Sequence, residues 1–341
     1  MAAIELDCLS FRYPGTERDT LASLNLNVED GEAHALLGAS GAGKTTLLNL
    51  LSGLLAPTQG RILFDGADVS ALPGRARSVA QVFQFPVLYE SLSVEDNLAF
   101  PLRVKKAPRR QIAERLQVVC DELELNHLRQ AKPRSLSLFE KQLVAVGKAL
   151  VRPEVTLVLL DEPLTAVEPR IKWRLRQSLK RVQADLGVTM IYVTHDQTEA
   201  LTFADRVSVL TADGILQTDT PEIIYQSPSH EFVGHFVGSP GMNFVSAEVL
   251  GVQGAERVGF RAEWAQLDAD AQLRGPVIRE RVQGTRDGKP FGLLTIDSPY
   301  GLLNVRGPMP AASQLGVKTG VRVARYVAFS NQLKVAEGEL L

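Results

Sequence analysis

The sequence predicts two parts, a mixed α/β domain over residues 1–240 and a small β-barrel over residues 241–341. In the first part, short apolar runs alternate with helical patterns, which is typical of a largely parallel sheet covered by helices. After the segment GSPGMNF at Gly238–Phe244, long helical periodicity ends, and short β-rich runs separated by Gly, Pro and Asp follow. A length of 341 residues also fits two domains of unequal size.

The elements of the α/β part follow from its periodicity. Short apolar runs predict strands at residues 33–37, 79–83, 155–160 and 188–193. Helical patterns predict helices at residues 44–54, 109–123, 138–151 and 168–184, and the last carries Pro169 where a missing N–H group costs little. From about residue 86 to residue 153 the strands disappear and prolines separate short helical stretches, which predicts an inserted helical subdomain.

Composition excludes several classes of function. A formal net charge of -2 gives no overall basic field that would attract nucleic acid or acidic lipid. The two cysteines, Cys8 and Cys120, lack CxxC spacing, so we expect neither a disulfide framework nor a zinc site. The longest apolar runs, such as residues 155–160, fall well short of the roughly 18 residues that mark a membrane span. We therefore do not expect this chain to cross a bilayer.

The segment GASGAGKTT at Gly38–Thr46 follows an apolar run and opens a helical pattern, as a phosphate-binding loop requires. Glycines let backbone N–H groups wrap a β-phosphate, Lys44 neutralises the β/γ oxygens, and the Thr45 hydroxyl can ligate Mg²⁺. The alternative is a glycine-rich turn that binds nothing, which the full spacing and the flanking strand and helix disfavour. The sequence thus predicts a P-loop NTPase fold whose ATP site consists of Gly38, Ser40, Gly41, Ala42, Gly43, Lys44, Thr45 and Thr46.

Two carboxylates end the apolar run VTLVLLDEP. Burial of Asp161 and Glu162 would be costly unless they hold a metal or perform chemistry. Asp161 is the natural Mg²⁺ partner, directly or through water, and Glu162 is placed to polarise an attacking water. A helix N-cap is the alternative interpretation of such a pair, and the upstream loop disfavours it.

Three further polar or aromatic residues complete the predicted nucleotide site. Gln84, after VAQVF, is expected to reach both Mg²⁺ and water, and His195, in MIYVTHD, to donate a hydrogen bond to the γ-phosphate. Tyr13, in FRYPG, offers a ring that can stack on adenine. Each signal is weak alone, since His195 could be a structural residue at a strand end and Tyr13 an ordinary core aromatic.

Taken in order, the phosphate-binding loop, Gln84, LSLFEKQ, LLDEP and VTHD resemble the nucleotide-binding subunits of ABC transporters. The resemblance covers about the first 240 residues. It implies a head-to-tail dimer in which each ATP lies between the loop of one subunit and the signature helix of the other.

The tail extends the resemblance. EALTFADRVSVL, GSPGMNF and VGFRAEW are similar to import-type subunits for sugars and polyols, which carry a C-terminal OB-like regulatory barrel. LSLFEKQ with DEPLTAVEPRIKWRLR is most similar to the ATPase subunits of glycerol importers. The resemblance implies a peripheral ATPase on the cytoplasmic face of the cell membrane. Its implied partners are two permeases, a second ABC subunit and an extracytoplasmic solute-binding protein, without nucleic acid.

The signature helix departs from the family pattern. Where the family usually reads Leu-Ser-Gly-Gly-Gln or Leu-Ser-Gly-Gly-Glu, this chain keeps Ser137 and Glu140 but replaces both glycines by Leu138 and Phe139. Glycine permits close approach of the helix N-terminus to the partner's γ-phosphate, whereas the larger side chains add bulk there. Three more positions also differ, namely Leu143 for Arg or Lys, Gly147 for Ala and Glu168 for Asp.

These departures fall on surfaces offered to a partner, whereas the residues around this chain's own ATP are intact. The pattern favours one competent site in a heterodimer, and a homodimer would carry the altered helix in both sites. A subunit that binds ATP but turns it over slowly is the competing function. A ribosome- or DNA-associated ABC protein would usually carry two cassettes or a long coiled coil, and an exporter cassette would usually be fused to membrane spans. We also expect residues 84–93, QFPVLYESLS, to line a groove for a short permease helix, although their apolar side chains could be ordinary core.

Overall fold

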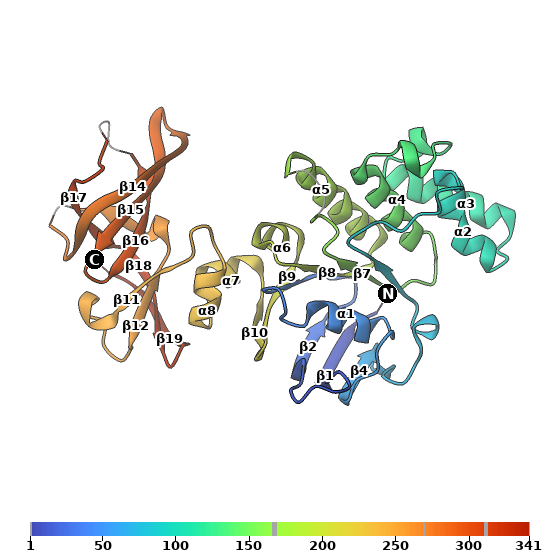
Figure 1. Cartoon of the computed structure of the whole chain (residues 1–341), viewed down its shortest axis with the longest axis horizontal. Coiled ribbons are helices and arrows are strands. Elements are labelled where there is room, and N and C mark those ends of the chain that lie inside the picture. Colours follow the sequence, from blue (N-terminus) through green and yellow to red (C-terminus); the bar gives the residue numbers. More distant parts are fainter. Residues whose placement is uncertain (1, 166–168, 269, 310–312, 341) are drawn as a thin grey trace. The chain divides into compact units, whose positions relative to one another are not determined.

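A computed structural model describes residues 2–165, 169–268, 270–309 and 313–340 (Figure 1). The chain divides into two compact units, Met1–Pro221 and Glu222–Leu341. The division lies closer to the N-terminus than the boundary at residue 240 that the sequence predicts. None of the helices in the described ranges combines the length and the apolar character of a membrane span.

The N-terminal unit is built on a six-stranded sheet with the order β10-β9-β3-β8-β7-β6. Pairing is parallel from β9 to β6, and only β10 runs antiparallel to its neighbour. Every residue of β3 and β8 is buried, because helices and a second sheet exclude water from both faces. The four predicted strands are confirmed, and the six strands are β3 (Ala33–Leu37), β6 (Val79–Val82), β7 (Leu157–Asp161), β8 (Thr189–Thr194), β9 (Arg206–Thr211) and β10 (Gly214–Asp219).

A second, antiparallel sheet covers the helix that follows the phosphate-binding loop. Its strands are β1 (Ile4–Phe11), β2 (Leu21–Val28), β4 (Gln59–Phe64) and β5 (Ala67–Asp68), in the order β2-β1-β4-β5. Helix α1 (Lys44–Leu51) buries four leucines in a core that includes Ile4 and Leu24 from this sheet and Leu159 from the six-stranded sheet. Helix α1 is thereby fixed between the two sheets, which sets the position of the loop at its N-terminus.

The remaining helices of this unit form a second core. They are α2 (Val94–Val104), α3 (Arg109–Glu122), α4 (Leu138–Leu150), α5 (Pro169–Leu186) and α6 (Gln197–Phe203), and α3, α4 and α5 confirm predicted helices. Gly147 lies where α4 meets α2 and α3. A Cβ atom at this position would stand 2.8 Å from Leu98 and 3.0 Å from Leu123. Glycine costs about 1 kcal/mol in a helix relative to alanine, and close packing of the three helices explains its presence. The expectation that all the departures lie on surfaces offered to a partner is therefore wrong for Gly147 and for Leu143, which are both buried.

The C-terminal unit contains two short helices and two antiparallel sheets. Its elements are α7 (Pro221–Gln226), α8 (Glu231–Phe236), β11 (Asn243–Ser246), β12 (Arg257–Phe260), β13 (Ala265–Leu267), β14 (Leu273–Arg286), β15 (Lys289–Ser298), β16 (Gly301–Pro308), β17 (Lys318–Val323), β18 (Arg325–Ser330) and β19 (Leu333–Glu339). The sheets have the orders β11-β12-β18-β19 and β13-β17-β14-β15-β16. One core joins them, with Phe260 from the first sheet and Ile296 and Val321 from the second. The tail is β-rich as expected, and an OB-like barrel stays a proposal.

Arg261 explains why α7 and α8 belong to this unit. Its side chain is fully buried, and its guanidinium donates to the carbonyl oxygens of Tyr225 (2.9 Å and 2.6 Å), Gly234 (3.0 Å) and Val237. Burial lowers the pKa of Arg261 to about 10, so the group stays charged at neutral pH. These carbonyls lie at the C-terminal ends of α7 and α8, where a cation is favourable. One arginine beside β12 therefore ties both helices to the C-terminal sheets.

Candidate functional site

The phosphate-binding loop connects β3 to α1, as predicted. Gly41 and Gly43 have φ values of +85° and +90°, which side chains rarely adopt. A Cβ atom at Gly43 would stand 2.5 Å from the Leu21 side chain, and one at Gly38 would collide with the Leu210 carbonyl oxygen. The glycines are thus required by the backbone path and by packing, while the Ser40 side of the loop is exposed.

Lys44 begins α1 and is held against the loop. Its ammonium group donates to the carbonyl oxygens of Gly38 (2.8 Å) and Ala39 (2.9 Å). Burial lowers the pKa of Lys44, and the negative charges of Glu162 and Asp161 oppose that shift. A buried cation beside exposed loop N–H groups is suited to binding a polyphosphate.

Asp161 is the last residue of β7 and Glu162 follows it, and the two carboxylates differ in environment. Burial raises the pKa of Asp161, as does the charge of Glu162, while the Thr45 hydrogen bond and the Lys44 charge oppose the rise. Burial also acts to raise the pKa of Glu162, but hydrogen bonds with His195 and Thr165 outweigh it and lower the pKa below the usual value. The structure therefore brings Lys44, Thr45 and both carboxylates together, and the hydroxyl and carboxylate oxygens among them are hard donors that fit Mg²⁺.

Glu162 has a strained backbone and a fixed side chain. Its φ is +44°, in the left-handed region, and its N–H group donates to the carbonyl oxygen of Val193 on β8 (3.0 Å). The carboxylate lies 2.9 Å from His195 Nδ1 and accepts a hydrogen bond from the Thr165 hydroxyl (2.9 Å). Such strain costs on the order of 1–3 kcal/mol and persists where the surroundings enforce it. The arrangement holds a carboxylate and an imidazole together at the sheet edge.

Two other predicted residues lie beside this cluster. The Tyr13 hydroxyl is 3.2 Å from the Thr46 hydroxyl, and its ring is 39% exposed, so the ring borders the loop instead of lying in the core. Gln84 follows β6, the neighbour of β7, at the carboxyl edge where Asp161 ends. Glu168 falls outside the described residues.

The signature helix keeps its N-terminal frame. Ser137 caps α4: its hydroxyl accepts from the Glu140 N–H (3.3 Å), and the Glu140 carboxylate accepts from the Ser137 N–H (2.7 Å). Leu138 is 36% exposed, whereas Phe139 packs against the helical core and lines a cavity of about 530 Å³ that α5 borders. The Arg174 guanidinium lies 6.0 Å from the Phe139 ring centre. Of the two bulky residues, Leu138 is therefore the more exposed and Phe139 is oriented toward the subdomain's own core.

A groove of about 780 Å³ opens beside the segment 84–93. Phe83 and Val87 line it and are 45% and 63% exposed, and Phe85 beside them is 66% exposed. Leu88 packs against the helical core instead. The amide of Gln81, another lining residue, has both polar atoms buried without a hydrogen-bond partner. The segment thus combines one core residue with an exposed apolar surface.

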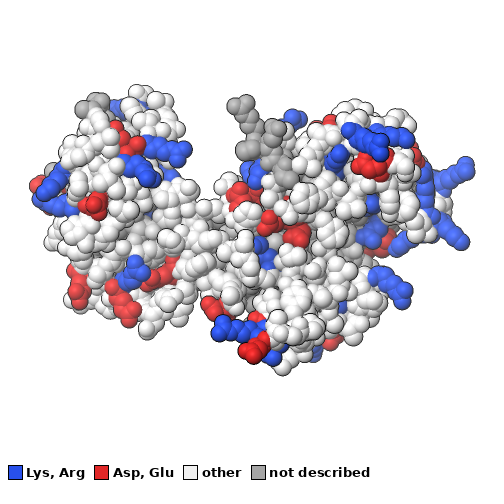
Figure 2. Space-filling view, in the orientation of Figure 1, with Lys and Arg blue, Asp and Glu red and all other residues white. Residues whose placement is uncertain are grey.

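Basic side chains gather over the helical subdomain around α2 and α3 (Figure 2). Lys105 there pairs with Glu154 at 2.6 Å, and Arg110 pairs with Glu114 at 2.7 Å, with the arginine 90% exposed. Exposed pairs of this kind contribute little stability. Lys105, at the end of α2, and Arg110, at the start of α3, are thus solvated charges at helix ends.

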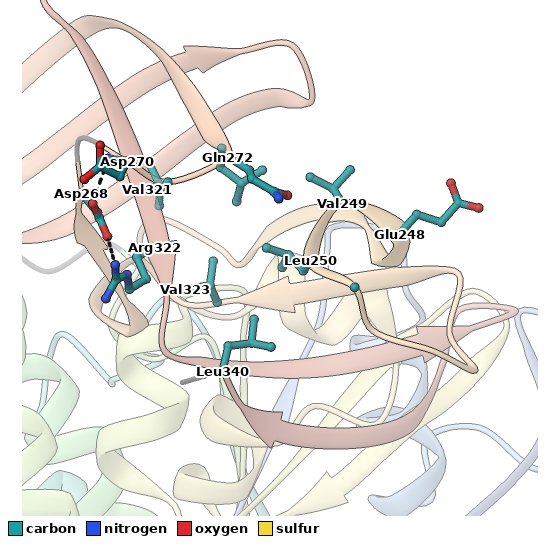
Figure 3. A pocket seen from close by; sticks show the side chains of 13 residues that line it. Glu248, Val249, Leu250, Asp268, Asp270, Gln272, Val321, Arg322, Val323 and Leu340 are labelled. Atoms are coloured by element: carbon teal, nitrogen blue, oxygen red, sulfur yellow. Dashed lines mark hydrogen bonds and ion pairs between the residues drawn. The ribbon is translucent and has the colours of Figure 1, made fainter.

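The C-terminal unit has a cavity of its own, of about 630 Å³ (Figure 3). Val321, Val323 and Leu340 form an apolar side. On the polar side, Asp268 accepts from the Arg322 guanidinium and from the Asp270 N–H (3.0 Å). Of the charged side chains that line this cavity, Asp268 and Arg322 thus form an ion pair.

The comparisons with known proteins agree with this geometry. A family model described as "ABC transporter" matches residues 21–165. The sn-glycerol-3-phosphate import ATP-binding protein UgpC of Chromohalobacter salexigens is 40% identical over 298 residues, which cover 87% of this chain and 80% of that protein. The chain belongs to the ABC transporter family. UgpC and a second relative, MalK, carry the names of import ATP-binding proteins, for sn-glycerol-3-phosphate and for trehalose/maltose respectively.

This chain spans a smaller share of other relatives, less than two thirds of the length of some of them. The trehalose/maltose import ATP-binding protein MalK of Thermococcus litoralis is 42% identical over 240 residues, 68% of this chain but only 64% of that protein. A solved dimeric ATP-binding cassette in a post-hydrolysis state, bound to ADP and phosphate, superposes with a TM-score of 0.56 at 27% identity. That match covers 64% of this chain and 98% of the solved one.

The structure adds residues that the sequence reasoning missed. Thr165 orients Glu162, and Glu199 on α6 accepts hydrogen bonds from the strand that ends at His195. Spacing gives a partial signal for Glu199, which follows His195 by four residues. Its role depends on burial and on contacts with α5, which a sequence pattern does not reveal.

As the pH falls, we expect Mg²⁺ binding to weaken at a higher pH than it would if the aspartate had its ordinary pKa. A raised pKa means that Asp161 takes up its proton at higher pH, and a protonated carboxyl is a poor ligand. Glu162→Gln removes a charge that raises this pKa and should extend Mg²⁺ binding to lower pH. Calorimetric titration of Mg²⁺ with a non-hydrolysable ATP analogue across pH, with exposed Glu114→Gln as control, measures the shift. An unchanged or higher midpoint in Glu162→Gln contradicts it.

Proposed function

We propose that the chain binds Mg²⁺-ATP and hydrolyses it to power import of a small sugar or polyol, with glycerol as the specific candidate, through separate permeases. The single observation that carries the proposal is the Glu162 carboxylate, held 2.9 Å from His195 beside Lys44 and Asp161 at the sheet edge. The import ATP-binding subunits among its relatives support the transport role.

The residues have distinct proposed roles. Loop N–H groups from Gly38 to Thr46 and the Lys44 ammonium bind the phosphates, and the exposed ring of Tyr13 stacks on adenine. Thr45 and Asp161, with Gln84, would hold Mg²⁺, which supplies charge stabilisation at the phosphates when bound. Glu162, which is ionised at neutral pH, accepts a proton from the attacking water. His195 donates to the γ-phosphate, and Glu162 fixes the orientation of its ring.

Glu162→Gln should retain ATP binding and lose turnover. The amide is isosteric but cannot accept the proton, and a tenfold loss already corresponds to about 1.4 kcal/mol of transition-state stabilisation. We expect a loss larger than that in the assembled transporter, measured as steady-state ATPase rate, with ATP affinity measured in parallel. Near-normal turnover would remove Glu162 as the catalytic carboxylate. Lys44→Ala is the matched control, because it should lose ATP affinity.

We propose that the groove beside residues 84–93 receives a short helix from each permease. Exposed Phe83 and Val87 line the groove and supply apolar contact area, and exposed Phe85 and Tyr89 extend the apolar surface along the same segment. Since Gln84 begins the same segment, movement of the groove can be transmitted to the ATP site. The segment therefore supports a mechanical link between permease and nucleotide.

Single cysteines at Val87 or Glu90 should crosslink to a permease in the assembled complex. The exposed native thiol Cys8 is first replaced by serine, and a cysteine at Glu114, exposed on α3, serves as the control. Mass spectrometry of the crosslinked species identifies the partner. If neither the cysteine at Val87 nor the one at Glu90 crosslinks, or if the cysteine at Glu114 crosslinks equally well, the groove is not the docking site.

The signature helix supports an asymmetric pair as the assembly, with a different ABC subunit as partner. Oxyanion-type stabilisation requires donors within hydrogen-bond reach, and losing one commonly costs about 3 kcal/mol. Leu138 adds exposed bulk at the helix start, while Phe139 is accommodated by the helical core. Leu138 is therefore the residue that weakens the partner's site. It also keeps open the alternative of a weakly hydrolysing subunit with a structural or regulatory role.

Ser137→Arg should leave about half or more of the ATPase rate in the assembled transporter if a different subunit supplies an intact signature helix. The substitution blocks only the site that uses this chain's own helix. Mass spectrometry of the purified complex establishes whether a second cassette is present. Loss of all turnover, or a complex with two copies of this chain, contradicts the one-site proposal. Leu138→Gly, with inward Phe139→Gly as control, then tests which residue limits the site.

Permease partners would place the chain on the cytoplasmic face of the membrane, with an extracytoplasmic binding protein delivering solute. We propose that the C-terminal unit is an OB-like regulatory barrel, which the common core of its two sheets supports.

A further inference from the structure

Glu199 is a buried carboxylate close to the proposed ATP site that the mechanism above does not use. Its side chain is 1% exposed and lies in the first turn of α6. One oxygen accepts from the hydroxyls of Tyr192 and Thr194, each at 2.9 Å, and the other accepts from the Lys172 ammonium at 2.9 Å. Burying a charged carboxylate carries a large desolvation cost, which is tolerated when the carboxylate is paired with a cation and fully hydrogen-bonded.

The donors come from the two elements that carry the site. Tyr192 and Thr194 are on β8, which ends immediately before His195. Lys172 is near the start of α5, the helix that follows Glu162 in the chain. Thr194 extends the network, because its hydroxyl also accepts from the Asp196 N–H at 2.9 Å. Both neighbours of His195 in the chain are thus anchored to the Glu199 network.

We propose that Glu199 is a positioning residue that holds His195 against Glu162, with Lys172 as its charge partner. The inference rests on the proposed hydrolysis at Glu162. Glutamine cannot reproduce this network, since its NH₂ group would face either the Lys172 ammonium or the two hydroxyls, which would then have to accept a hydrogen bond instead of donating one. His195 would then lose its fixed distance from Glu162 while the phosphate-binding loop stayed in place.

The kinetic test compares two buried carboxylates. Glu32 is a matched control: its side chain is 6% exposed and pairs with His34 Nδ1 at 2.6 Å, at the opposite end of β3 from the phosphate-binding loop. In the full chain, or the assembled transporter, we expect Glu199→Gln to lower kcat about tenfold or more while the KM for ATP stays within about threefold. Lys172→Met should lower kcat in the same way, whereas Lys172→Arg, which keeps the positive charge, should retain most of it. If Glu32→Gln, at equal loss of Tm, lowers kcat as much, Glu199 is merely structural.

A second measurement does not depend on turnover. The chain has five histidines, so ring signals of ¹³C-histidine-labelled protein are few, and His195→Gln assigns the signal of His195. Glu199→Gln should shift the His195 signal, whereas Glu32→Gln should shift that of His34 alone. An unmoved His195 signal in Glu199→Gln overturns the inference. Failure of the proposed function would instead appear as absent hydrolysis in the wild type with the His195 shift intact.

Discussion

The site depends on one constraint, that neighbouring parallel strands end at the same edge of a sheet. In the register of the six-stranded sheet, Leu37 pairs with Thr194 and Val193 pairs with Asp161. The next residues along the three strands are therefore a loop glycine, a histidine and a glutamate. Three segments far apart in sequence meet without any special connection, because strand pairing alone aligns them.

The cluster at this edge is also an electrostatic compromise. Lys44 is partly desolvated, and the two carboxylates offset that cost, while burial and then the charge of Glu162 raise the pKa of Asp161. Burial also acts to raise the pKa of Glu162, but its hydrogen bonds with His195 and Thr165 lower the pKa instead. The two adjacent carboxylates thereby differ, since the pKa of Asp161 is raised whereas that of Glu162 is lowered and Glu162 keeps its negative charge over a wider pH range.

The sequence predicted those parts of the fold whose signal is local. The runs of β3 and β8 are mostly apolar, since both faces are buried, and the loop glycines follow a fixed spacing. The sheet containing β2 was missed although its signal is present, since apolar residues alternate with exposed polar ones along β2 as in a half-buried strand. The inward direction of Phe139 and the role of Glu199 depend on α5 packing beside them, and local patterns carry no information about such contacts.

The left-handed backbone at Glu162 has a consequence for how this position can change. Glycine and asparagine adopt that conformation with less strain, so replacing the glutamate by either would relax the backbone. Stability alone would therefore favour loss of the carboxylate here. A glutamate that persists in such a backbone is evidence of a trade-off, in which a reactive group is kept at the expense of folding free energy.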